Sequence, residues 1–357
     1  MLESKLDSVL VWFRRDLRSD DHVALADALR RARRVYCAFV FDREILDVLS
    51  DRLDRRVDFI RGSLIELDSA LLQRGGGLIV RHARATDEIP RLAGELGVAA
   101  VFANRDYEPQ SKRRDAKVAD VLGKLGIGFE SFKDQVVFDG TEVLTLAGKP
   151  YTVFTPYKNA WLKRLTDDDL SIGIHEQRAD SGKLVASSLA GKIPALAEIG
   201  FAPTDLPTLA VVPGMAGARQ LVERFCAVGA IARYAQERDF PALDGGSRLS
   251  VHLRFGTVSI RELANRALAH GALTGAAGPA TWLSELIWRD FYFMILDHFP
   301  HVAERAFKPE YDAIAWESGD LADARFAAWC AGKTGFPLVD AAMRQINTTG
   351  YMHNRLR

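Results

Sequence analysis

The sequence predicts an α/β domain with a doubly wound, five-stranded parallel sheet, followed by an all-α domain. Five short apolar segments alternate with helical patterns up to about residue 135, and helical periodicity runs almost unbroken from about residue 217. Between them Gly, Pro, Ser and Thr are frequent and the periodicity is lost. We therefore expect an α/β domain over 1–135, a long connector over 136–216 and a helical domain over 217–357.

The apolar segments of the first domain have the length and composition of buried strands. They are SVLVWF (8–13), VYCAFVF (35–41), LIVRH (78–82), VAAVFAN (98–104) and GIGFESF (126–132). Helical patterns lie between them, and the longest, over 52–73, is closed by GGG. Strands joined by right-handed helical crossovers run parallel, so helices should cover both faces of the sheet. Such sheets bind ligands at the carboxyl ends of their strands, where a nucleotide-type ligand is expected.

The second domain contains no pattern other than helices. The helical segments lie over 217–238, 259–273, 280–299, 323–332 and 338–350. The last one runs into GYMHNRLR at 350–357, where Asn354, Arg355 and Arg357 follow without a Gly or Pro stop signal.

Composition excludes several classes of protein. Hydrophobic residues make up 48% and charged residues 26%, and the 47 basic residues balance the 47 acidic ones. DNA binding would therefore need a local basic groove. No apolar run could span a membrane, and MLESKLDSVL is too polar for a signal peptide. Cys37, Cys226 and Cys330 are scattered and the His residues are dispersed, so we expect a cytoplasmic protein without disulfides or a metal site.

One glycine-rich segment of the helical domain suits phosphate binding. In GGSRLS (245–250), glycines permit a close backbone approach, Ser247 and Ser250 offer hydroxyls, and Arg248 offers a fork of donors before a helix. The alternative is an ordinary N-cap after a glycine turn.

The segment TWLSELIWRDFYF (281–293) suits the binding of a base. At helical spacing Glu285, Trp288, Arg289 and Tyr292 share one face, which combines an acceptor, a stacking plane and a phosphate contact. The alternative is a core Trp with a local ion pair between Glu285 and Arg289.

Together these segments resemble one family, the DNA photolyases and cryptochromes. WFRRDLR at 12–18, GGSRLS, ELIWRDFY at 285–292 and KTGFPLVDAAMRQINTTGYMHNRLR at 333–357 match its signature segments in sequence and order. The class I cyclobutane pyrimidine dimer photolyases are the most similar branch. Trp288 and the His353-Asn354 pair favour this branch over single-strand-preferring and (6-4) enzymes.

The resemblance implies a reduced FAD in the helical domain. The residues that match flavin contacts are Tyr234, Gly246, Ser247, Arg248, Leu249, Ser250, Glu285 and Arg357. It also implies light-driven repair, in which an electron from FAD splits a dimer that has been flipped out of duplex DNA. Glu285, Trp288 and Asn354 are the implied catalytic residues. The implied DNA contacts are Arg238, Glu285, Trp288, Arg289, Asn354 and Arg355, and the protein is expected to be a monomer.

The chain departs from the family pattern at three places. The family's chains continue beyond the equivalent of Arg357, so we expect a truncated helical domain with exposed apolar faces and weak FAD binding. Trp316 matches the outermost Trp of the electron-transfer chain but is equally consistent with packing. Tyr351 replaces a Trp. The folate-contacting pair is not matched, since Gln110 and Ser111 stand there, so the antenna chromophore is a deazaflavin, another chromophore or none.

Two other functions are compatible with these features. A cryptochrome-type light sensor would use the flavin for signalling without repair. A non-catalytic remnant would fold only in its first domain, and everything after the connector would be lost in limited proteolysis.

Overall fold

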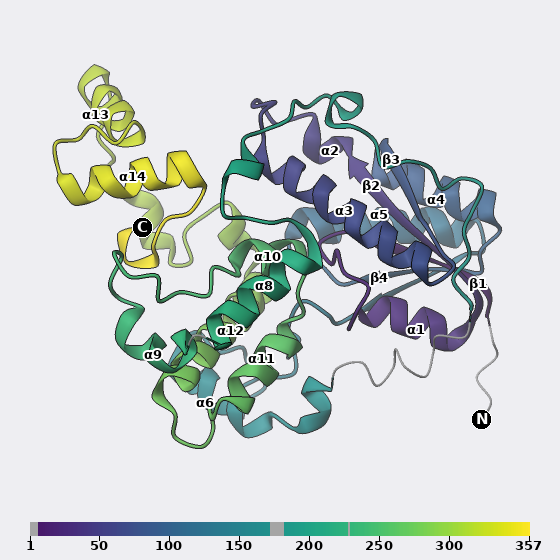
Figure 1. Ribbon diagram of the computed structural model, residues 1–357, viewed down its shortest axis with the longest axis horizontal. Helices are drawn as coiled ribbons and strands as arrows, with labels where there is room; N and C mark the ends of the chain where they lie inside the picture. The colour runs from purple at the N-terminus through teal and green to yellow at the C-terminus, as the bar shows by residue number, and fades with distance from the viewer. Residues whose placement is uncertain (1–5, 172–181, 228) are drawn as a thin grey trace.

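A computed structural model describes residues 6–171, 182–227 and 229–357 of the chain (Figure 1). Its first domain confirms the predicted doubly wound sheet. All pairings are parallel, in the order β3-β2-β1-β4-β5. The strands are β1 (Leu6–Phe13), β2 (Ala32–Asp42), β3 (Leu78–Ala83), β4 (Ala100–Asn104) and β5 (Gly128–Phe132). The chain order reverses between β1 and β4, which opens a crevice at their carboxyl ends.

Helices cover both faces of this sheet, as the apolar runs predicted. Their bounds are α1 (Val23–Arg31), α2 (Arg43–Leu46), α3 (Arg55–Gln73), α4 (Ala85–Leu96) and α5 (Pro109–Lys124). Alternate residues of β1 enter two separate cores: Val9 and Val11 pack with α1 and α3, whereas Leu10 and Trp12 pack with α4 and α5. A strand that is buried on both faces reads as a continuous apolar run for this reason.

The second domain is built around one long helix, α12 (Ala277–His298). The helices around it are α6 (Phe154–Arg164), α8 (Gly214–Ala227), α9 (Ala230–Glu237), α10 (Ser250–Phe255) and α11 (Ile260–Ala269). Two further helices, α13 (Asp320–Cys330) and α14 (Pro337–Thr349), lie at one edge of the molecule (Figure 1). Short 3₁₀ helices connect these elements: η1 (Asp167–Leu170), η2 (Leu196–Ile199), η3 (Leu206–Thr208), η4 (Pro300–Ala303), η5 (Pro309–Ala313) and η6 (Asn354–Leu356).

Several residues of the connector predicted over 136–216 pack into the two domains, and its residues 172–181 lie outside the described part. Val137, Phe138 and Trp161 belong to the helical core. Further along, Leu196 and Phe201 pack into the core of the α/β domain. Apolar residues that fill grooves singly leave no periodic pattern, so the sequence did not reveal their burial.

A buried ionic network joins the two domains. Arg18 and Arg261 both donate to Asp134, at 2.6 and 2.8 Å, and Arg261 also pairs with Asp21 at 3.0 Å. Burial pushes the pKa of Asp134 upward, but the two guanidinium groups outweigh it and hold that pKa well below its usual value. Gly256 packs against the same junction so closely that a Cβ would lie 2.2 Å from the Arg15 carbonyl oxygen.

Candidate functional site

The side chains of Tyr234, Arg238 and Glu285 form one cluster where α9 packs on α12. Arg238 donates to Glu285 Oε1 at 2.5 Å, and its guanidinium lies 5.5 Å from the centre of the Tyr234 ring. Gly278 permits this close packing, because a Cβ there would lie 2.2 Å from the Ile231 carbonyl oxygen. Burial raises the pKa of Tyr234 to about 12, and the Glu285 carboxylate acts in the same direction. The Arg238 guanidinium thus holds the half-buried Glu285 carboxylate and can also face an anionic ligand.

Trp288 lies one turn further along α12 and is half-buried. Its indole stacks on Phe154 with ring centroids 3.6 Å apart and an angle of 8° between the planes. Tyr292 flanks it with centroids 5.5 Å apart. Sequence reasoning missed Phe154, which comes from α6 and carries no motif of its own.

The structure contradicts the predicted position of Arg289. Its guanidinium donates to the Gln135 carbonyl oxygen and lies 4.6 Å from the centre of the Phe293 ring. Burial lowers the pKa of Arg289 to about 10. The alternative of a local ion pair between Arg289 and Glu285 is therefore wrong, because Glu285 pairs with Arg238 instead, while a contact between Arg289 and DNA stays a prediction. A helical wheel places the residue on a face, but a long side chain bends toward the carbonyl that it can reach.

The glycine-rich segment forms a tight turn that ends in α10. Gly245 is buried, and a Cβ on it would lie 2.6 Å from Glu237 Cβ. Arg248 adopts a φ of 54°, which is rare outside glycine, and pairs with Asp244 at 2.8 Å. Leu249 is buried in the helical core, whereas Ser247 is half-buried and Ser250 exposed. The turn therefore anchors itself by Leu249 and presents hydroxyls and a guanidinium outward.

The final segment of the chain lies against this turn and against α9. The Tyr351 ring centre lies 4.6 Å from the Arg248 guanidinium, and Arg355 pairs with Asp239 at 2.7 Å. Asn354 begins the exposed helix η6, and Arg357 donates to the Met352 carbonyl oxygen at 3.2 Å. The structure thus brings most of the predicted site residues together from segments that are distant in the sequence.

A cavity of about 440 Å³ adjoins the glycine-rich turn. Arg248, Ser250 and Tyr351 line one side, and Phe59 of α3 and Leu221 of α8 line the others. Hydroxyl and guanidinium donors beside aromatic and aliphatic walls suit a ligand with phosphates and flat rings, and the volume is typical of cofactor pockets. The donor set therefore fits a flavin dinucleotide. A Cβ on Gly246 would meet only the Tyr351 hydroxyl, at 3.9 Å, so the backbone of the turn can be approached closely.

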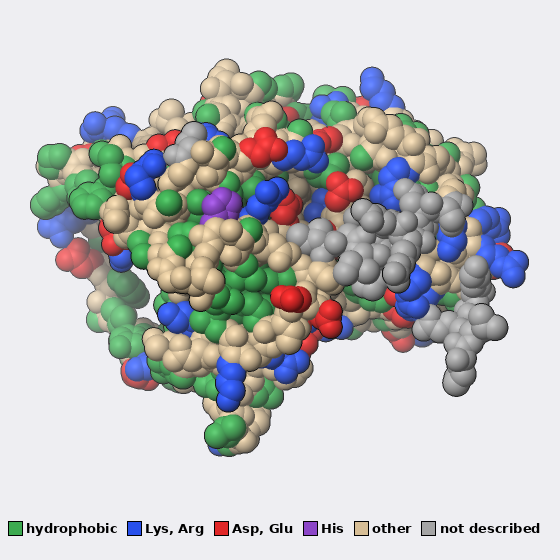
Figure 2. Space-filling view, turned by 60° about the horizontal axis from the view of Figure 1, so that its bottom comes forward, with side chains coloured by type: hydrophobic (Ala, Val, Ile, Leu, Met, Phe, Trp, Pro, Cys, Tyr) green, Lys and Arg blue, Asp and Glu red, His purple; other side chains and the backbone are tan. Residues whose placement is uncertain are grey.

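The helices near the end of the chain expose many apolar side chains, as expected. Figure 2 shows hydrophobic side chains gathered at the left edge, where α13 and α14 lie. They include Leu321, Phe326, Trp329, Phe336 and Leu338. Trp316 is 81% exposed, so the alternative that it packs in a core is wrong, while its role in electron transfer stays a prediction.

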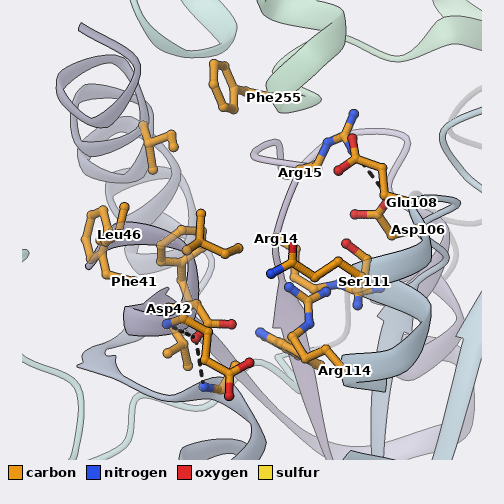
Figure 3. Close-up of a pocket in the computed structure, with 18 of the residues that line it drawn as sticks. Arg14, Arg15, Phe41, Asp42, Leu46, Asp106, Glu108, Ser111, Arg114 and Phe255 are labelled. Atoms are coloured by element: carbon orange, nitrogen blue, oxygen red, sulfur yellow. Dashed lines mark hydrogen bonds and ion pairs between the residues drawn. The ribbon is translucent and has the colours of Figure 1, made fainter. Parts of the chain in front are cut away.

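A second cavity, of about 220 Å³, lies at the crevice predicted from the strand order (Figure 3). Trp12 lines it with a side chain that is only 1% exposed, and the guanidinium carbons of Arg14 and Arg114 lie 4.7 and 4.9 Å from its ring centre. Gln110 and Ser111 also line it. In Figure 3, Phe255 of α10 reaches over the cavity from the helical domain. The position of this cavity was predictable from the strand order of the sheet. The contacts between Trp12, Arg14 and Arg114 were not.

Two further properties concern the described part of the chain as a whole. None of its helices is long and apolar enough to cross a membrane. No group of three or more potential ligands within it could hold a metal ion.

Comparisons with known proteins agree with this geometry. The DNA photolyase profile matches residues 9–176, and the profile of the FAD binding domain of DNA photolyase matches residues 282–357. The deoxyribodipyrimidine photo-lyase of Escherichia coli is 37% identical over 98% of this chain and 72% of its own length.

Two solved structures are similar over nearly the whole chain. A crystal structure of a class III photolyase from Agrobacterium tumefaciens superposes with a TM-score of 0.85 at 30% identity, covering 99% of this chain and 71% of that one. The photolyase of Sulfolobus tokodaii, described with two FAD molecules and a novel light-harvesting cofactor, has a TM-score of 0.79 at 29% identity, covering 98% and 73%. With the α/β and flavin-type helical domains both matched, this chain belongs to the DNA photolyase family.

Proposed function

We propose that this protein repairs cyclobutane pyrimidine dimers in DNA by a light-driven reaction that uses FAD. The observation that supports this best is the Arg238–Glu285 pair, which lies beside the half-buried Trp288 and close to the glycine-rich turn. The Glu285 carboxylate would serve as the hydrogen-bond acceptor, the Trp288 indole as the stacking surface and the glycine-rich turn as the phosphate-binding segment. Reduced FAD, excited by light, would supply one electron that opens the cyclobutane ring and would take it back afterwards.

Residues of this chain would hold the lesion and the flavin. Glu285 would accept hydrogen bonds from the pyrimidine edge, while Trp288 would pack against the dimer. Asn354 would lie at the mouth of this pocket. Arg238 and Arg355 would contact the DNA backbone, although each has an acidic partner that a phosphate must share or replace.

Flavin phosphates would lie at the glycine-rich turn. Ser247 and Ser250 would donate from their hydroxyls and Arg248 from its guanidinium, while Gly246 lets the backbone come close. Tyr234 stays protonated at neutral pH, so its hydroxyl can donate a hydrogen bond to the cofactor. Flipping a dimer out of the helix costs a few kcal/mol, and less at a damaged step, which helps to discriminate lesions from intact DNA.

The test begins with the flavin. FAD released by heat from the purified chain is quantified, and a FAD titration follows if none is present. The loaded protein is then given an oligonucleotide duplex with one cis-syn thymine dimer, under blue light or in the dark. One bound FAD per chain and light-dependent loss of the dimer would support the proposal. Absence of both binding and repair would refute the proposed function.

Repair is favoured over sensing because the Glu285 carboxylate and Trp288 lie together at the predicted lesion site. A dimer-binding assay in the dark separates the two functions, since a sensor without repair activity has no reason to prefer damaged DNA. We also propose that the protein acts as a monomer, which light scattering during gel filtration would check.

We further propose that the cavity over Trp12 holds a light-harvesting chromophore of the flavin or deazaflavin type. Arg14 and Arg114 lie over the buried Trp12 ring and share Asp115, so an anionic ring or side chain in the cavity would meet two guanidinium groups that have one carboxylate between them. A folate is not supported by Gln110 and Ser111. Addition of 8-hydroxy-5-deazariboflavin or FMN and measurement of the absorption retained after gel filtration would distinguish the candidates.

A further inference from the structure

Trp288 has one face that is fully covered by another chain segment. Phe154, the first residue of α6, lies parallel to the indole at 3.6 Å, so nothing else fits between the two rings. Most aromatic pairs in proteins are offset or tilted, and a nearly coplanar pair this close restricts the rotation of both rings.

Phe154 is itself held in place relative to α12. Two residues beyond Trp288, Asp290 Oδ2 accepts hydrogen bonds from the Val137 and Phe138 amides and from Trp161 Nε1, at 3.0, 3.2 and 3.1 Å. Trp161 lies on the same helix as Phe154, so this carboxylate ties α6 to α12. Phe154 also meets Phe291 edge to face at 5.8 Å. The covering ring is therefore partly buried and packed against the helical core.

The opposite face of the indole is different. Among the described residues no ring apart from Phe154 stacks on the indole as closely: Tyr292 lies at 5.5 Å with a side chain that is 62% exposed, and Phe291 meets the indole edge to face at 5.6 Å. A base that packs on Trp288 therefore meets this face, beside Tyr292 or in its place.

We propose that Phe154 is a positioning residue for lesion binding. It holds the indole of Trp288 in one orientation, so that the open face is ready before the dimer arrives. This inference rests on the proposed function. Without the covering ring, Trp288 would sample several rotamers. Binding of the dimer would then have to order the side chain, and this loss of conformational entropy would weaken binding.

The test is a double-mutant cycle on dimer binding in the dark. Phe154→Leu should raise the Kd for dimer-containing duplex about tenfold, which corresponds to about 1.4 kcal/mol. The same change in a Trp288→Ala background should have almost no further effect, because the ring to be positioned is gone. Phe154→Tyr keeps the stacked ring and should bind like the wild type. Once dimer DNA is saturating, the repair rate per absorbed photon should change little.

The matched control is Phe138→Leu. Phe138 is buried in the same helical core and packs on Trp161 at 5.2 Å, without contacting Trp288. This variant reports the general effect of a smaller side chain in that core, and bound flavin is measured for every variant.

Three results would overturn the inference: wild-type affinity of Phe154→Leu, an equal loss in the Trp288→Ala background, or an equal loss from Phe138→Leu. If Phe154→Leu does not fold, Phe154→Met serves in its place. A wild-type protein that binds FAD but shows no preference for dimer DNA would instead refute the proposed function, which is a separate outcome.

Discussion

Asp290 should make the stability of the helical domain depend on pH. The carboxylate is fully buried, and burial raises its pKa from 3.8 to about 6 despite the neighbouring Arg289 guanidinium and the hydrogen bonds that it accepts. Its Oδ1 has no hydrogen-bond partner among the described residues. A proton on that oxygen therefore removes a buried charge without breaking the three hydrogen bonds to Oδ2.

Proton linkage determines whether Asp290 stabilises the fold at low or at high pH. Because the folded state binds the proton more tightly than the unfolded state, Asp290 stabilises the fold fully below pH 3.8, and this contribution is lost as the pH rises through about 6. The difference between the two pKa values corresponds to about 3 kcal/mol over the whole titration, of which about 2 kcal/mol falls between pH 4.5 and 8.

The substitution Asp290→Asn removes this titration and keeps an oxygen that can accept the same three hydrogen bonds. The free energy of unfolding of the variant, minus that of the wild type, should therefore rise by about 2 kcal/mol from pH 4.5 to pH 8. Urea unfolding at a series of pH values, followed by Trp fluorescence, measures this difference. Asp320→Asn, at the exposed start of α13, controls for the loss of a carboxylate. A difference that stays constant with pH, or that falls as pH rises, would refute the argument.

Three other predictions concern separate parts of the molecule. Gly256→Ala should destabilise the chain by at least about 3 kcal/mol, because its φ of 65° and the Arg15 carbonyl leave no room for a Cβ; a melting temperature within a few degrees of the wild type would contradict this. Arg238→Ala should weaken dimer and undamaged DNA alike and lower the slope of log Kd against log salt by about one, whereas an unchanged slope would exclude a phosphate contact. Arg114→Ala should abolish retention of the deazaflavin probe without changing FAD content, as measured by absorption; loss of both chromophores would argue against separate sites.

Much of the fold was predictable because it depends on local patterns. The inner strands β1, β2 and β4 are largely buried on both faces, so they appear in the sequence as apolar runs, whereas the edge strand β5 is only partly buried. The helices between the strands leave few possible topologies. The crevice at the carboxyl ends of β1 and β4 follows from the strand order alone. The turn at 245–250 was recognisable from its two glycines, and at Gly245 the close approach of Glu237 leaves no room for a Cβ.

The rest was decided by contacts between distant segments. Arg238 pairs with Glu285, and Phe154 covers Trp288, although neither pair shares a sequence pattern. Arg289 shows most directly what the sequence pattern could not predict. Helical spacing placed it on the lesion face, but the Gln135 carbonyl lies within its reach and draws the side chain to the domain junction. The sequence by itself determined the strands of the sheet and most of the helices, because hydrophobic periodicity is local, but not α6 in the connector. Only the tertiary structure decided which side chains meet at the site, because long polar side chains turn toward partners that packing places beside them.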